Sequence, residues 1–196
     1  MNKRVQQAAH NREELLHAAE EVFRAQGVHV PLQEIIDHAG VGRATFYRNF
    51  SDRKALMFAL LDQAMMRLEQ RASALLEYND GFIRLIEGHI EQLPHLIVLI
   101  DYWRIIDRED PIMLNIYERR DKALQPLIDK AIDLRIKHNL LPLAIAALDA
   151  GGHLVTFRRE DGCGILRSDI AIGKAWGSLG MGMSTRQIRD RLSDRP

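Results

Sequence analysis

Residues 39–56 read AGVGRATFYRNFSDRKAL, and this stretch decides how the N-terminal part of the chain folds. Gly40 can adopt the left-handed backbone conformation that a tight turn needs, so the stretch predicts a short helix, a turn and a second short helix. The second helix, predicted over residues 43–49, exposes polar and basic side chains at Arg43, Thr45, Tyr47 and Arg48. Such a helix is suited to lie in a DNA groove against the phosphates.

Two helices are predicted before the turn, and the later of them is the short helix that leads into it. The first begins at Asn11, whose side chain can form a capping box with Glu14, and it ends at Gly27. The second begins at Pro31, because a fixed φ and a missing N–H suit the first helical position. Apolar residues at helical spacing form the expected core of this small domain: Leu15, Ala18, Ala19, Val22, Phe23, Leu32, Ile35, Ile36, Ala39, Phe46 and Phe50.

The remaining residues are also predicted to be helical, because no run alternates apolar and polar residues for long enough to indicate a sheet. Ser51 is a suitable cap for a long fourth helix that extends to about Leu76. Pro126 lies inside a helical stretch and either starts or kinks that helix. The predicted fold class is therefore all-α, with a three-helix helix-turn-helix domain over residues 1–50 and a larger helical domain over residues 51–196.

The last third of the chain has apolar residues at alternating spacings of four and three, as in helices packed nearly in line. One such set is Leu143, Ala147, Ala150, Leu154 and Phe157, and the other is Ile172, Trp176, Leu179 and Met183. Gly173, Gly177, Gly180 and Ser184 form a stripe beside the second set. Glycine inside a helix costs about 1 kcal/mol relative to alanine, so the stripe indicates that another backbone comes close. We expect an intersubunit four-helix bundle, with an intrachain contact or a frayed C-terminal region as the alternative.

Composition restricts the possible function classes. The formal net charge of the 196 residues is +0, so a nucleic-acid contact must come from a local patch, which Arg43, Arg48, Arg53 and Lys54 supply. The single cysteine, Cys163, excludes an internal disulfide and four-thiolate zinc sites.

The sequence also bears on catalytic, metal and cofactor sites and on the location of the protein in the cell. The histidines show no metal-ligating pattern, and no nucleophile or phosphate-binding motif is visible, so we expect no catalytic residue, metal or cofactor. No segment approaches the roughly 18 apolar residues of a membrane span, and the N-terminus lacks a signal peptide. The protein is expected to be cytoplasmic, with no membrane partner.

The block from Arg12 to Leu56 resembles the DNA-binding domain of TetR-family transcriptional regulators. The matching residues are Leu16, Ala18, Ala19, Phe23, Gly27, Ile35, Ala39, Gly40, Val41, Thr45, Phe46, Tyr47, Phe50, Lys54 and Leu56. Members of this family join a helix-turn-helix domain to a helical ligand-binding domain that dimerises through its last two long helices. The resemblance implies a transcriptional regulator, most often a repressor, that binds a palindromic double-stranded DNA operator as a homodimer. It also implies a small-molecule effector that changes operator affinity.

The DNA-contacting residues are expected at and around the second helix of the motif. Because the N-terminal residues of such a helix face the base edges, Arg43 and Ala44 are the predicted base readers. Gly42 stands where the family commonly has a capping serine. The remaining predicted contacts are Gln33, to backbone or base, and Thr45, Tyr47, Arg48 and Lys54, to phosphates.

The resemblance places the effector in the core of the larger domain. The candidate lining residues are Phe82, Ile86, His89, Tyr102, Trp103, Met113, Tyr117 and Trp176. Ordinary core packing is the competing interpretation, because aromatic and methionine side chains at helical spacing also fill cores. The competing function is a helical small-molecule-binding protein or enzyme whose N-terminal helices are structural, which would bind ligand without DNA affinity.

Overall fold

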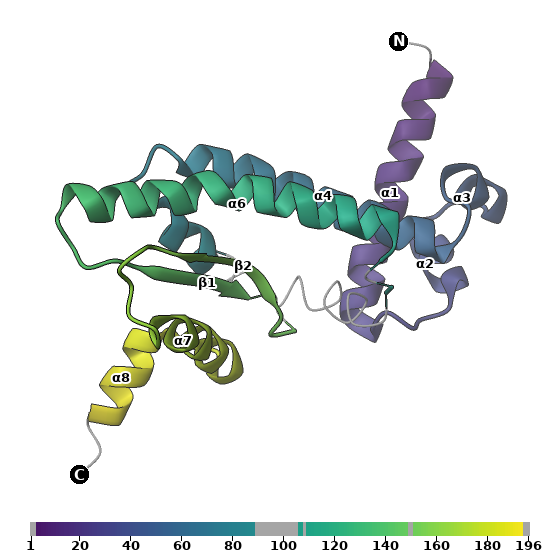
Figure 1. Cartoon of the computed structure of the whole chain (residues 1–196). Coiled ribbons are helices and arrows are strands. Elements are labelled where there is room, and N and C mark those ends of the chain that lie inside the picture. The colour runs from purple at the N-terminus through teal and green to yellow at the C-terminus, as the bar shows by residue number, and fades with distance from the viewer. Residues whose placement is uncertain (1–2, 89–105, 108, 149–150, 194–196) are drawn as a thin grey trace. The chain divides into compact units, whose positions relative to one another are not determined.

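The structure is a computed structural model, and it describes residues 3–88, 106–107, 109–148 and 151–193 (Figure 1). The chain divides into two compact units. The first consists of Met1–Arg71 and Ile86–Arg120, and the second of Ala72–Leu85 and Asp121–Pro196. The described residues are mainly helical, as predicted, and they include one two-stranded sheet in the second unit.

The helices at the N-terminus are α1 (Lys3–Gln26), α2 (Leu32–His38), α3 (Arg43–Asn49) and α4 (Arg53–Leu75). The predicted start of the first helix at Asn11 is wrong, because α1 already begins at Lys3. The Asn11 side chain accepts a hydrogen bond from Gln7 Nε2 at 2.9 Å, one turn earlier in the same helix. A residue that is a good cap is thus used within a longer helix.

The core of the N-terminal helices contains most of the predicted apolar residues, whereas Leu32 and Ala39 are only half-buried. α1 packs against both α2 and α3. Phe23, Ile35 and Phe46 are fully buried, and the rings of Phe46 and Phe50 lie 5.7 Å apart. Gly40 has a φ of +65°, which confirms the left-handed turn between α2 and α3.

The next described long helix is α6 (Pro111–Lys137). It begins among residues of the first unit and ends among residues of the second. Pro126 lies inside it, so Pro126 does not start the helix. A shorter helical segment covers residues 81–88.

The second unit contains an antiparallel hairpin of β1 (Ala144–Leu148) and β2 (Leu154–Arg159), in which Ala144 pairs with Arg159. The predicted helix through the seam Leu143, Ala147, Ala150, Leu154 and Phe157 is therefore wrong, although Ala150 itself lies outside the described residues. The physical reason is the turn between the strands, where Gly152 has a φ of +82°. The β-branched residues around it favour strands over a helix.

Two helices follow the hairpin: α7 (Arg167–Met181), which packs on β1, and α8 (Thr185–Ser193). The second predicted seam is helical as far as Leu179, but α7 ends at Met181 and its C-cap, Gly182, has a φ of +61°, so Met183 follows the helix. A Cβ placed on Gly173, Gly177 or Gly180 would meet nothing within 4 Å. The backbone that the glycine stripe was expected to approach is therefore not provided by the described part of this chain.

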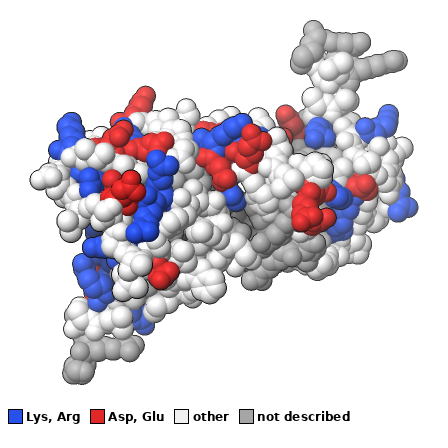
Figure 2. All heavy atoms as spheres, in the orientation of Figure 1, with Lys and Arg blue, Asp and Glu red and all other residues white. Residues whose placement is uncertain are grey.

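The charged side chains on the face drawn in Figure 2 are intermixed, as the net charge of zero suggests. Within the described ranges, no helix combines the length and apolar character that crossing a membrane requires.

Candidate nucleic-acid interface

The recognition helix α3 begins at Gly42, which has an extended backbone with φ −78° and ψ 153°. The Gly42 carbonyl accepts hydrogen bonds from the N–H groups of Thr45 at 2.8 Å and Phe46 at 3.1 Å. Glycine has no side-chain oxygen to cap the helix, and its substitution for serine costs only a few tenths of a kcal/mol, roughly. The helix can therefore begin at this position without the usual serine.

One face of α3 is buried and the other is exposed. Phe46 is 0% exposed, whereas the adjacent Tyr47 is 51% exposed and its ring meets that of Phe46 edge-on at 5.3 Å. The exposed face contains Arg43, Ala44, Tyr47 and Arg48, while Thr45 is half-buried. The structure thus brings the predicted α3 contacts together on a single helix.

The two arginines of α3 differ in their contacts. Arg48 is held along its own helix, because its Nε donates to the Ala44 carbonyl at 3.1 Å and its Nη2 donates to Thr45 Oγ1 at 2.9 Å. The Arg43 side chain makes no hydrogen bond or ion pair with the other described residues. Arg43 is therefore the more available of the two for a base or phosphate.

Two other arginines support the motif instead of extending its basic surface. The guanidinium of Arg53 donates to the carbonyls of Val28 and Val30, in the turn between α1 and α2. Arg12 donates to the Asn49 carbonyl at 3.3 Å, and its guanidinium lies over the Phe50 ring. Sequence reasoning placed Arg53 in the basic patch, because the distant carbonyls that it binds have no signature in the sequence.

A side-chain hydrogen bond joins α2 to α1, and α2 contains one of the predicted DNA-contacting residues. His38 Nε2 lies 2.8 Å from Glu21 Oε2, and this hydrogen bond lowers the pKa of the Glu21 carboxyl. Gln33 is exposed, and its Nε2 donates to Asp37 Oδ1 at 2.7 Å. Gln33 would have to leave Asp37 in order to use its amide N–H on DNA.

The first unit also contains two charged contacts between α4 and the chain around the start of α6. Lys54 Nζ lies 2.6 Å from Asp110 Oδ2. Further along, Arg119 donates to both carboxylate oxygens of Glu69 at 2.8 Å and to Asp62 Oδ1 at 2.5 Å. These hydrogen bonds lower the pKa of Glu69 and raise that of Arg119. They hold the first part of α6 against α4.

The predicted effector-binding residues have different environments. Met113 is buried, Phe82 and Tyr117 are half-buried, and Ile86 and Trp176 are exposed. The Arg120 guanidinium lies 5.0 Å from the centre of the Tyr117 ring. The other three predicted residues, His89, Tyr102 and Trp103, lie outside the described residues.

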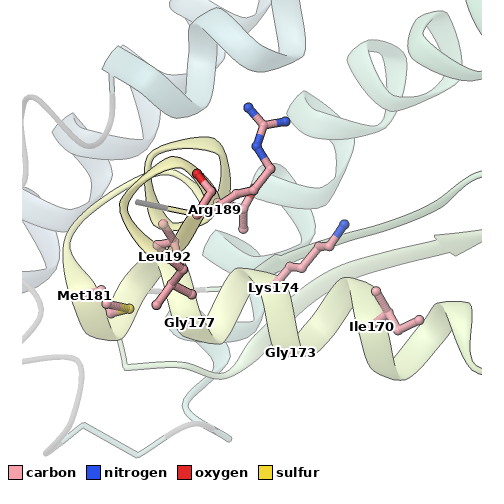
Figure 3. Close-up of a pocket in the computed structure, with 10 residues that line it drawn as sticks. Ile170, Gly173, Lys174, Gly177, Met181, Arg189 and Leu192 are labelled. Carbon is pink, nitrogen blue, oxygen red and sulfur yellow. The ribbon is translucent and has the colours of Figure 1, made fainter. Parts of the chain in front are cut away.

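An open groove of about 790 Å³ lies between α7 and α8, and it contains none of the predicted effector residues. Its walls are apolar at Ile170, Met181, Ile188 and Leu192, and Gly173 and Gly177 expose the α7 backbone. Figure 3 shows that the basic side chains of Lys174 and Arg189 extend in the same general direction. Sequence reasoning missed this groove because it treated the glycines as a packing surface. No group of three or more metal-ligating side chains occurs in the described portion of the chain.

Comparison with known proteins gives two family matches. Residues 15–60 match the family described as bacterial regulatory proteins, tetR family. Residues 121–196 match a different family, described as haem degrading protein HbpS-like. The second match begins at the residue where the second compact unit resumes. No curated protein matches the chain.

Several solved structures are similar to this chain. A TetR transcription regulatory protein from Mycobacterium vanbaalenii is 26% identical, with a TM-score of 0.54, over 66% of this chain and 80% of that one. A TetR-family transcriptional regulator from Streptomyces coelicolor is 24% identical, with a TM-score of 0.51, over 64% and 73%. The reduced form of NemR from E. coli is 16% identical, with a TM-score of 0.54, over 93% and 94%. The last two similarities concern the fold alone.

The helices α1–α3, with an exposed recognition helix after a glycine turn, define a helix-turn-helix DNA-binding protein. The match over residues 15–60 and the similar regulator structures support a particular class, a transcriptional regulator of the TetR family. Its residues from Asp121 onward are similar to a second family.

Proposed function

We propose that this regulator binds a palindromic operator as a homodimer and changes its operator affinity when a small molecule binds. Residues 1–50 would form the helix-turn-helix DNA-binding domain, and residues 51–196 would form the domain for dimerisation and effector binding, with Lys54 at its start reaching the DNA backbone. The exposed face of α3 is the observation that carries the proposal, because aromatic and basic side chains that are exposed on a helix whose other face is buried match a groove-binding surface. We also propose that the protein acts as a repressor and that it is cytoplasmic.

The proposed DNA contacts are Gln33, Gly42, Arg43, Ala44, Thr45, Tyr47, Arg48 and Lys54. Arg43 and Ala44 would read base edges near the start of α3, and the others would position the helix on the backbone. In a dimer, two recognition helices would dock into half-sites separated by about 34–36 Å, one turn of DNA. A small change in their separation would then prevent simultaneous docking.

The DNA proposal is tested by selecting bound sequences from random double-stranded DNA. The wild-type chain is expected to enrich a palindrome, and the double variant Arg43→Ala, Tyr47→Ala is expected to lose this enrichment. A matched control is Arg186→Ala, Tyr78→Ala, because both side chains are exposed and belong to the second unit. If the wild type enriches no sequence, the small-molecule-binding protein or enzyme with structural N-terminal helices becomes the better interpretation.

For the effector we propose an amphipathic anion, and haem is the first ligand to test. Two observations support this choice: the match to the HbpS-like family, and the groove between α7 and α8 in the matched segment. The apolar walls and the two basic side chains, Lys174 and Arg189, fit a flat apolar ring with carboxylate groups. Arg189 Nη2 lies 2.5 Å from Asp190 Oδ1, so Arg189 would have to exchange this partner for a ligand carboxylate. Met181 would supply the thioether, a known ligand of haem iron. A separate effector site in the core of the larger domain remains a proposal. Its candidate lining residues are Phe82, Ile86, His89, Tyr102, Trp103, Met113, Tyr117 and Trp176.

The effector proposal is tested by titrating hemin into the full chain and measuring both the Soret band and operator affinity. We expect a shifted Soret band with the wild type and a weaker shift with Met181→Leu. Met66→Leu is the matched control, because Met66 is similarly exposed, at 47% against 51% for Met181, and lies on α4. Hemin binding that leaves operator affinity unchanged would contradict haem as the effector.

A further inference from the structure

The contact between Lys54 and Asp110 joins a predicted DNA-binding residue to an acidic residue of the same unit. Lys54 lies in the first turn of α4, directly after the helix-turn-helix motif, and its side chain is 57% exposed. Its Nζ donates to Asp110 Oδ2 at 2.6 Å. Asp110 is only 12% exposed, so its carboxylate is the more enclosed partner of the pair.

The Asp110 carboxylate is held in place independently of Lys54. Its Oδ1 accepts a hydrogen bond from the N–H of Ile112 at 2.9 Å, and its carbonyl accepts one from Leu114 at 3.0 Å. Asp110 therefore acts as the N-cap of α6. Capping uses one carboxylate oxygen, and the second oxygen remains directed at Lys54.

We propose that Asp110 competes with a DNA phosphate for Lys54 and thereby lowers the affinity of the helix-turn-helix domain for DNA. A phosphate that approaches the start of α4 must take the ammonium group from a carboxylate that already binds it at short distance. The fixed negative charge of Asp110 also opposes the phosphate itself. The lysine can change partner because its flexible stem is exposed, whereas the cap keeps the carboxylate in place.

This inference rests on the proposed function, in which Lys54 contacts the DNA backbone, and it adds a residue that opposes that contact. Exposed ion pairs stabilise weakly, so releasing Lys54 alone should improve binding about two- to fivefold. Removing a carboxylate charge near the phosphates adds to this improvement. Asp110→Asn should therefore bind DNA about three- to tenfold more tightly than the wild type.

The experiment measures the affinity of the full chain for the selected operator and for a random-sequence duplex, at one fixed salt concentration. Asn is also a good N-cap, so Asp110→Asn retains the start of α6. The matched control is Asp107→Asn, which makes the same charge change three residues earlier at an exposed position. We expect tighter binding of both duplexes with Asp110→Asn and little change with Asp107→Asn.

A double-mutant cycle with Lys54→Ala separates competition from general charge repulsion. Asp110→Asn should improve affinity by less than twofold when Lys54 is already absent. An equal improvement in both backgrounds, or an unchanged or weaker affinity in Asp110→Asn, overturns the inference. Failure of the proposed function has a different result: random duplex is bound and responds to Asp110→Asn, but no operator sequence is enriched. Absence of binding to any duplex by all variants overturns both.

Discussion

Phe46 and Tyr47 are adjacent on α3, and we predict that replacing Phe46 destabilises the fold far more than replacing Tyr47. Phe46 is 0% exposed and its ring contacts Phe50 and Tyr47, at centroid distances of 5.7 and 5.3 Å. Truncating a buried phenylalanine to alanine costs about 3–5 kcal/mol. Phe46→Ala should therefore destabilise the packing of α1, α2 and α3 by about this amount.

The assay is hydrogen exchange of the full chain, followed by mass spectrometry of peptides from residues 15–60. Because about 1.4 kcal/mol corresponds to a factor of ten, slowly exchanging amides should exchange about a hundred to a few thousand times faster in Phe46→Ala. Tyr47→Ala is the matched control. Its side chain is 51% exposed, so its loss should cost about 1 kcal/mol, mainly from the ring contact with Phe46.

DNA affinity distinguishes the two residues further. Both variants should bind the operator weakly, but the loss of amide protection should be far larger in Phe46→Ala than in Tyr47→Ala. A loss of protection below tenfold in Phe46→Ala, or similar losses in the two variants, would refute the assignment of Phe46 to the core and Tyr47 to the interface.

Three more predictions concern the first unit. Gly40→Ala should destabilise it by about 1 kcal/mol, measured by urea denaturation, because φ is +65° and a Cβ meets no other atom within 4 Å. An unchanged midpoint would contradict the strain argument. Arg119→Met should cost about 1 kcal/mol at low salt and less in 1 M NaCl, because it removes the hydrogen bonds to Glu69 and Asp62. A salt-independent loss would indicate packing instead. The lowered pKa of Glu21 means that its bond to His38 stabilises the fold above the ordinary carboxyl pKa and is lost as the pH falls through the lowered value. Glu21→Gln should therefore flatten the pH dependence of unfolding below about pH 5, and a curve identical to that of the wild type would exclude this contribution.

Local rules were sufficient for much of the N-terminal fold. Gly40 marked the turn, and the spacing of Ile35, Ile36 and Phe46 identified the buried face. The same rules failed at Asn11, because a capping residue does not start a helix when the preceding residues can continue it. They also failed at Leu143–Phe157, where spacings of four and three matched a helix but a glycine turn and strand-favouring residues form a hairpin.

The sequence by itself determined the helix-turn-helix, its core and the side chains that face outward from α3. These features depend on residues close in the chain, whose backbone preferences and apolar periodicity act locally. Only the tertiary structure decided the partners of the charged groups: Arg53 on the carbonyls of Val28 and Val30, and Lys54 on Asp110. A charge in a sequence has many possible partners, and the packing of segments far apart in the chain selects among them.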